Sequence, residues 1–277
     1  MTPWFELPAG IICETGVIRV LEPADSNPLR LQSEILTGRY GKPFILDDGK
    51  VRQLYFTLRY LQSAMRVNAP TALELAYTRK MMGFLLFHSK PKRILIVGLG
   101  GGSLAKFCHR HLPRARITAL EIDPTVIAMA GQFCIPGDER LTIIEADAGD
   151  YLPRAEADTD VLMLDGFDAE GISSRLNQSA FYQAARRRLR PQGVLVANLA
   201  GSKEHWLPHL DMLKAAFDER VIVVRVAGQD NHIVFASAAP DFPPPWPALE
   251  KPARDLQQRL GLDFPDMLRK LRRAAGR

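Results

Sequence analysis

A run of apolar residues ends in a cluster of glycines at residues 93–103, Arg-Ile-Leu-Ile-Val-Gly-Leu-Gly-Gly-Gly-Ser. The stretch Ile94–Gly98 has the length of a buried strand, and a helical pattern follows from Leu104. Glycines between a strand and a helix let the backbone turn sharply and approach a ligand, while the first N–H groups of the helix stay free to bind it. This unit predicts a nucleotide-binding α/β core. A tight turn without a ligand is the alternative.

Strand-length apolar runs alternate with amphipathic helices throughout the segment that begins at Arg93. The runs are Ile94–Gly98, Ile117–Ile122, Leu141–Glu145, Val161–Asp165 and Val194–Leu199. This alternation predicts a mostly parallel sheet with helices on both faces. Two further runs, Val221–Val226 and His232–Ser237, are separated by the short turn Gly228–Asn231, which predicts an antiparallel hairpin at one edge of the sheet.

The two ends of the chain have different patterns. Short alternating runs in residues 11–56 predict a small antiparallel sheet, with strands at Gly16–Glu22, Leu29–Leu36, Pro43–Leu46 and Val51–Phe56. A helix is expected over residues 71–88. The proline-rich segment Pro240–Pro252 predicts an extended strap, followed by helices at Ala253–Leu260 and Pro265–Ala275. We therefore expect three parts, residues 1–70, 71–239 and 240–277.

Acidic residues follow the second and third predicted strands. Glu121 stands about twenty residues after the glycine loop, where a carboxylate can accept hydrogen bonds from a ribose diol. Asp123 precedes Pro124 and is expected to cap the next helix instead. Asp147 ends the third strand, where an acid can meet an adenine amino group. Because GLGGGS lacks the GxGxxG spacing of dinucleotide sites, these features favour an S-adenosylmethionine-type cofactor over NAD.

The core from Gln62 to Leu199 resembles the spermidine synthase-like, or polyamine aminopropyltransferase, family. The resemblance is carried by the glycine loop, Glu121-Ile-Asp123, Asp147-Ala148, Asp165-Gly-Phe-Asp168 and the stretch NQSAFYQAARRRLRPQGVLVANL. It implies the Rossmann-like S-adenosylmethionine-dependent methyltransferase fold together with a small N-terminal β-sheet. It also implies transfer of an aminopropyl group from decarboxylated S-adenosylmethionine to a small-molecule amine.

The resemblance assigns roles to individual residues. Asp165 falls on the catalytic base, Asp168 on an amine-binding partner, and Tyr77 on a residue of the amine channel. A protonated amine has no free lone pair, so carboxylates must hold the cation and accept a proton as the nucleophile forms. Helix capping by the two aspartates and core packing by Tyr77 are the alternatives. The expected nucleoside contacts are Gln62, Gly98, Gly100, Gly101, Glu121, Asp147 and Ala148.

Two positions depart from the family pattern. Gly101 stands where the synthases have an acid that holds the aminopropyl ammonium, and Gly83 stands where they have a histidine. The loop also resembles that of some eukaryotic methyltransferases. Two other functions therefore stay open: methyl transfer from intact S-adenosylmethionine to a protein or small amine, and a non-catalytic nucleoside-binding module.

Composition bounds the partners and the compartment. The net charge is +5 and its excess gathers in residues 269–277, which we interpret as a solvated helix face; nucleic acid or an acidic protein is the alternative partner, and we expect no nucleic-acid binding. Three widely spaced cysteines, Cys13, Cys108 and Cys134, are typical of a reduced compartment and form no zinc pattern, so we expect no metal. With no signal peptide or membrane-spanning segment in the sequence, the expectation is a cytoplasmic enzyme. A homodimer stays open.

Overall fold

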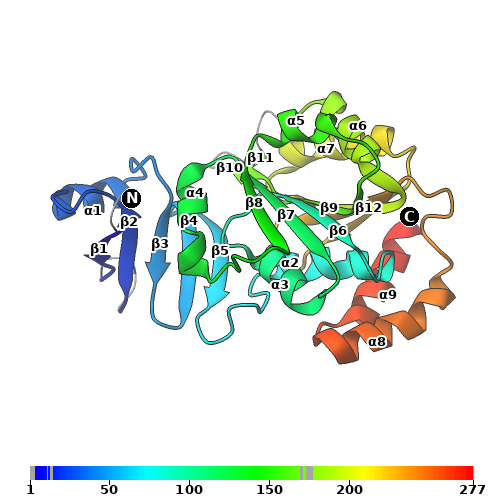
Figure 1. The fold of residues 1–277 in the computed structure, drawn as a ribbon, viewed down its shortest axis with the longest axis horizontal. Coiled ribbons are helices and arrows are strands. Elements are labelled where there is room, and N and C mark those ends of the chain that lie inside the picture. Colours follow the sequence, from blue (N-terminus) through cyan, green and yellow to red (C-terminus); the bar gives the residue numbers. More distant parts are fainter. Residues whose placement is uncertain (1–3, 11, 13–14, 169–170, 173–176, 277) are drawn as a thin grey trace.

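The computed structural model describes residues 4–10, 12, 15–168, 171–172 and 177–276. It contains a small antiparallel sheet and a larger, mostly parallel sheet with helices on both faces, which confirms the predicted α/β class (Figure 1). Within these residues, no helix is both long enough and apolar enough to cross a membrane. Cys108 is buried, Cys134 is exposed, and both are free thiols. Cys13 lies outside the described residues.

The small sheet has five antiparallel strands in chain order (Figure 1). They are β1 (Trp4–Pro8), β2 (Val17–Leu21), β3 (Phe44–Asp47), β4 (Val51–Thr57) and β5 (Tyr60–Arg66). β1 and β5 are additional to the strands predicted from the sequence. Apolar residues of this sheet, among them Leu54 and Met65, pack against Val126 and Phe133, which follow the second strand of the larger sheet in the chain. This contact brings β5 next to the glycine loop.

The predicted strand Leu29–Leu36 is wrong, because this segment forms helix α1 (Pro28–Leu36). The Asn27 side chain accepts a hydrogen bond from the Arg30 N–H at 3.1 Å, and Pro28 occupies the first helical position. Leu31 and Ile35, one turn apart, are both buried. An N-cap followed by proline is a helix start signal, and here it outweighs the alternation of apolar residues.

The large sheet has seven strands in the order β13-β14-β12-β9-β6-β7-β8. Figure 1 labels β12, β9, β6, β7 and β8 of this sheet. Their bounds are β6 (Arg93–Val97), β7 (Arg116–Glu121), β8 (Leu141–Glu145), β9 (Thr159–Leu164), β12 (Leu189–Leu199), β13 (Val221–Arg225) and β14 (His232–Ser237). β14 runs antiparallel to both of its neighbours, which confirms the predicted edge hairpin. A separate two-stranded ribbon joins β10 (Phe167–Asp168) and β11 (Gly171–Ile172).

Helices cover both faces of this sheet. Ile94 and Ile96 of β6 face one hydrophobic cluster, whereas Leu95 and Val97 face another, as the period of a strand requires. The first cluster includes α2 (Ala76–Met81), η1 (Met82–Leu86), α3 (Ser103–His111), η5 (Trp246–Leu249), α8 (Glu250–Leu260) and α9 (Phe264–Ala275). The second includes α5 (Ala148–Tyr151), η3 (Leu152–Arg154), α6 (Ser179–Arg188) and α7 (Lys203–Ala216), while α4 (Pro124–Ala128) and η2 (Ala130–Phe133) adjoin the small sheet.

The predicted helices hold with changed bounds. The expected helix over 71–88 is shorter, because residues 71–75 are not helical and the segment continues from α2 as the 3-10 turn η1. Both C-terminal helices are present and pack on the sheet through buried faces (Figure 1). The predicted boundaries between the three parts of the chain stay predictions.

Candidate active site

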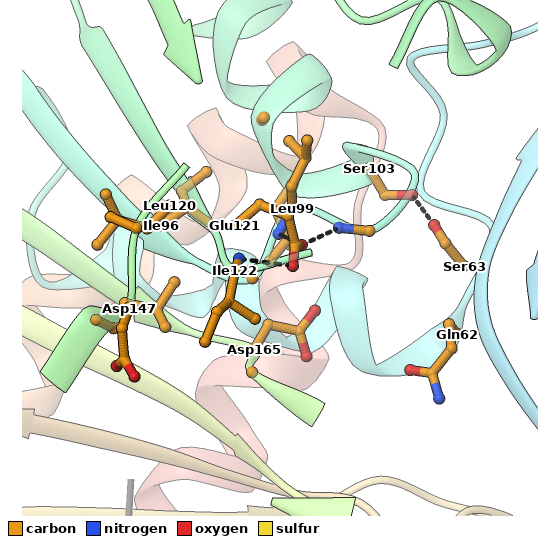
Figure 2. A pocket seen from close by; sticks show the side chains of 18 of the residues that line it. Gln62, Ser63, Ile96, Leu99, Ser103, Leu120, Glu121, Ile122, Asp147 and Asp165 are labelled. Atoms are coloured by element: carbon orange, nitrogen blue, oxygen red, sulfur yellow. Dashed lines mark hydrogen bonds between the residues drawn. The ribbon is translucent and has the colours of Figure 1, made fainter. Parts of the chain in front are cut away.

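A cavity of about 370 Å³ opens at the carboxyl ends of β6, β7 and β9, beside β5 of the small sheet. Ligands of open α/β sheets bind at this edge. Figure 2 shows side chains from both sheets around the cavity. The residues predicted from the sequence that line it are Gln62, Tyr77, Gly98, Gly100, Glu121, Asp147, Ala148 and Asp165. Their individual roles stay predictions.

The structure does not place the other two predicted residues at the cavity. Gly101 is not among the residues that line the cavity, although it belongs to the described chain. Asp168 lies in β10, and its side chain is outside what the structure describes.

Glu121, at the end of β7, organises the glycine loop. Its Oε2 accepts hydrogen bonds from the backbone N–H groups of Leu99 at 3.0 Å and Gly100 at 3.4 Å (Figure 2). Its Oε1 accepts from the N–H groups of Ile122 and Asp123 at 2.9 and 3.1 Å. The carboxylate therefore joins two loops. These four bonds engage its four lone-pair sites, so a ribose diol that binds here would share them with the backbone N–H groups.

Asp123 and Asp147 both begin helices. Asp123 Oδ1 accepts from the Thr125 N–H at 2.7 Å, with Pro124 at the first helical position, so the predicted cap is confirmed. Asp147 Oδ1 accepts from the Gly149 N–H at 2.8 Å, and the same residue lines the cavity. Capping fixes the Asp147 side chain where it lines the cavity, which Ile122, an exposed residue, also lines.

Asp165 follows β9 and receives two neutral hydrogen-bond donors. Tyr77 of α2 donates its hydroxyl to Asp165 Oδ2 at 3.0 Å, and Asn198 of β12 donates Nδ2 to Oδ1 at 2.9 Å. Gly98 lets the glycine loop lie close against the backbone of Asp165. Its φ is +91°, and a side chain there would overlap the Asp165 carbonyl oxygen. Residues far apart in the chain thus hold one carboxylate at the cavity.

Burial raises the pKa of Asp165 to about 6, although the Asn198 and Tyr77 hydrogen bonds act in the opposite direction. The residue as a whole is half-buried, and it lines the cavity. Burial, the Asp165 charge and their hydrogen bond raise the pKa of Tyr77 well above its ordinary value. Tyr77 therefore stays a donor, and Asp165 is a carboxylate able to take up a proton near neutral pH.

Comparison with known proteins identifies the family. A family model described as the spermine/spermidine synthase domain matches residues 74–221. The polyamine aminopropyltransferase of Chromobacterium violaceum is 36% identical over 82% of this chain and 88% of its own length. The chain belongs to the spermine/spermidine synthase family.

Solved structures support the same fold. Human methyltransferase-like protein 13 in complex with SAH has a TM-score of 0.61 and 30% sequence identity, over 68% of this chain and 93% of that one. A spermidine synthase in complex with the transition state analogue AdoDATO has a TM-score of 0.64 over 83% of this chain and 79% of its own. At 19% identity, the latter likeness concerns the fold.

The packing around Gly101 leaves no space for a side chain at this position. A Cβ atom there would stand 2.6 Å from Ser63 Oγ and 2.9 Å from Phe133 Cδ1. Ser63 belongs to β5 and Phe133 to η2, so two elements close this position. An acidic side chain at residue 101 has no room unless they move.

Other elements close the space around Gly83. A Cβ atom at this position would lie 2.6 Å from Met267 Sδ of α9 and 2.8 Å from Phe235 Cζ of β14. The C-terminal helix thus occupies the space beside η1 that a side chain at residue 83 would need. Gly83 is buried and does not line the cavity.

Sequence reasoning missed three polar residues of this site. Ser63 and Ser103 line the cavity, with their Oγ atoms 3.3 Å apart (Figure 2). Asn198 stands behind Asp165 and is 5% exposed. The position of Asn198 near the end of a predicted strand was a usable signal, but nothing local indicated that β5 carries Ser63 to the glycine loop. Among the described residues, no group of three or more His, Cys, Asp or Glu side chains is arranged to hold a metal ion.

Proposed function

We propose that this chain is a polyamine aminopropyltransferase that transfers an aminopropyl group from decarboxylated S-adenosylmethionine to a small amine. The observation that carries the proposal is Asp165, a carboxylate with a pKa of about 6 held by two donors at the cavity. Family membership and the SAH complex of the human neighbour support an S-adenosylmethionine-related co-substrate.

The proposed reaction is a direct displacement. The amine nitrogen attacks the carbon next to the sulfonium, a C–N bond forms, the C–S bond breaks, and methylthioadenosine leaves. The nitrogen must lose one proton, and Asp165 accepts it. Glu121 and Asp147 are the proposed ribose and adenine contacts, Tyr77 is the proposed wall of the amine channel, and Asp168 is a proposed second carboxylate for the acceptor.

A methyltransferase that uses intact S-adenosylmethionine is the second candidate. Position 101 is closed by Ser63 and Phe133, and neither Gly101 nor the neighbouring Ser63 and Ser103 carries a charge. At this position the chain neither attracts the ammonium of the decarboxylated donor nor repels the carboxylate of the intact one. Similarity to human methyltransferase-like protein 13 supports the same alternative.

The deciding experiment offers both donors to the purified chain with putrescine or spermidine and identifies the nucleoside product by mass spectrometry. We expect methylthioadenosine from the decarboxylated donor. S-adenosylhomocysteine as the sole product would overturn the aminopropyl proposal in favour of methyl transfer. Binding of both donors without any product would leave the non-catalytic module.

Replacement of the proposed base separates chemistry from binding. Asp165→Asn should lower turnover by about 10²–10⁴ and leave nucleoside affinity nearly unchanged. Because the folded-state pKa lies above the unfolded value, the charged carboxylate opposes folding above pH 6, so this variant should melt no earlier than the wild type at neutral pH. Asp241→Asn, an exposed acid after the sheet, is the control. Near-normal turnover of Asp165→Asn would refute the assignment.

A further inference from the structure

Two side-chain amides stand in series behind Asp165. Asn198 Nδ2 donates to Asp165 Oδ1 at 2.9 Å, and Asn231 Nδ2 donates to Asn198 Oδ1 at 2.9 Å. Asp165 follows β9, Asn198 is near the end of β12, and Asn231 precedes β14. These three strands are neighbours in the sheet, so the series runs along its carboxyl edge. Neither amide lines the cavity.

The series has one polarity. A carboxylate only accepts hydrogen bonds, so the Asn198 amide must present its Nδ2 to Asp165. Its Oδ1 then faces Asn231 and requires a donor, which Asn231 supplies through its own Nδ2. If the Asn198 amide rotated by half a turn, its oxygen would face the charged carboxylate. Asn231 opposes that rotation.

Water is a poor substitute for Asn231. Asn198 is 5% exposed, so its oxygen has little access to solvent. The turn between β13 and β14 holds Asn231 in place, because its carbonyl accepts a hydrogen bond from the Val226 N–H at 2.9 Å. Without the Asn231 donor, the buried oxygen of Asn198 would therefore have no hydrogen-bond partner.

We propose that Asn231 is a positioning residue that acts through Asn198 to keep Asp165 oriented as an ionised base. The inference rests on the proposed function of Asp165, and it extends that function to a hairpin turn outside the cavity. Asn231 does not line the cavity. Its hydrogen bonds within the described residues go to Asn198 and Val226, not to Asp165.

The charged groups around Asp165 cannot account for a change in its pKa when Asn231 is replaced. Tyr77 faces it from α2 as a neutral hydroxyl, and Asn198 faces it from β12. Glu121 and Asp147 are the other acids that line the cavity, after β7 and before α5. Replacing Asn231 by a neutral residue alters none of these charges, so any change at Asp165 must pass through the amide series.

The test uses Asn231→Leu, which keeps the approximate size and removes the donor. We expect turnover to fall about tenfold near pH 6.5 and to recover partly above pH 8, because the weakened hydrogen bond raises the pH at which Asp165 becomes charged. The carboxyl titration of Asp165, followed by carbon NMR and assigned with Asp165→Asn, should move to higher pH. The Michaelis constant of the donor and the melting temperature should change little.

A second variant removes the donor without introducing a charge. Asn231→Ala leaves the Asn198 oxygen without its partner and should show the same titration change, whereas Asp230→Asn, at an exposed neighbour in the turn, should match the wild type.

Three outcomes overturn the proposal or separate it from the proposed function. An unchanged Asp165 titration in both Asn231 variants would overturn it, and so would a loss of turnover that is equal at every pH. A wild type that transfers no group from either donor would refute the proposed function instead. In that case the NMR titration would still decide whether Asn231 acts on Asp165.

Discussion

At the scale of single residues, Asp165 shows two opposing contributions to one pKa. Burial disfavours the charged carboxylate, whereas hydrogen bonds from Asn198 and Tyr77 favour it, and burial is the larger contribution. The result is a group that is charged above about pH 6 and protonated below it. An activity that needs the charged base should therefore be lost as the pH falls through 6.

Removal of the Tyr77 hydroxyl tests this balance. Tyr77→Phe removes a hydrogen bond that lowers the pKa of Asp165, so the pKa should rise further. We expect the acid limb of the pH–turnover profile to move upward by about one pH unit, the scale of a hydrogen bond to a charged group. Tyr60→Phe, at a side chain that is 59% exposed in β5, is the control. A profile identical to that of the wild type would show that Tyr77 serves packing alone.

Glu121→Gln should affect two properties at once. The carboxylate accepts four backbone hydrogen bonds, two on each oxygen. In glutamine one of these oxygens is replaced by an amide nitrogen, which cannot accept the two bonds at its position. We expect methylthioadenosine affinity to fall by about 1.5–3 kcal/mol and the melting temperature to fall as well. Calorimetry and thermal unfolding measure the two effects. A stable variant with unchanged affinity would exclude Glu121 from both roles.

At the scale of elements, local sequence signals predict the structure correctly where hydrogen bonds within one element decide it. The cap at Asp123 and Pro124 forms as predicted. The equivalent signal at Asn27 and Pro28 begins α1 in a segment whose alternation of apolar residues predicts a strand. β5 was missed for another reason: its alternation is weak, and its pairing with β4 decides its conformation.

The glycine loop is the element whose sequence depends most on its neighbours. Gly101→Ala would press a methyl group against Ser63 and the Phe133 ring, so we expect a loss of about 1–3 kcal/mol in unfolding free energy. Chemical denaturation measures it. Gly131→Ala, whose Cβ would meet nothing within 4 Å, is the matched control. Equal stability of the two variants would show that η2 and β5 yield easily, and that position 101 is open to an acid.

At the scale of the whole molecule, Asp160 ties the central strands together at the edge opposite the site. Its carboxylate accepts the backbone N–H groups of Lys92 and Arg93 at 2.7 and 2.9 Å and an Arg190 hydrogen bond at 2.9 Å. Burial alone would raise its pKa, but these donors and the Arg190 charge hold the pKa below its ordinary value. The carboxylate therefore stabilises the fold above its unfolded-state pKa, and this contribution is lost as the pH falls through the folded-state pKa.

Asp160→Asn should lower the unfolding free energy by about 2 kcal/mol and the melting temperature by about 4–8 °C at neutral pH, without changing nucleoside affinity. The difference from the wild type should shrink in strong acid. Asp255→Asn removes an exposed pair with Lys251 and should shift the melting temperature by less than about 2 °C. A similar small shift for Asp160→Asn would contradict its structural role.

What the sequence by itself determined is the part that local chemistry controls. Alternating strands and helices, the glycine loop, the edge hairpin and the acids after successive strands were all readable, because each depends on residues close together in the chain. Acids at the ends of parallel strands must then gather at one edge.

Only the tertiary structure decided the rest. It brought Tyr77 and Asn198 to Asp165, placed Ser63 and Phe133 around Gly101, and lodged α9 beside Gly83. These contacts join residues far apart in the chain, and periodicity carries no record of which distant elements pack together. Whether a glycine stands open to a ligand or is closed by a neighbouring ring depends on that packing, and so do the pKa and orientation of the buried carboxylate.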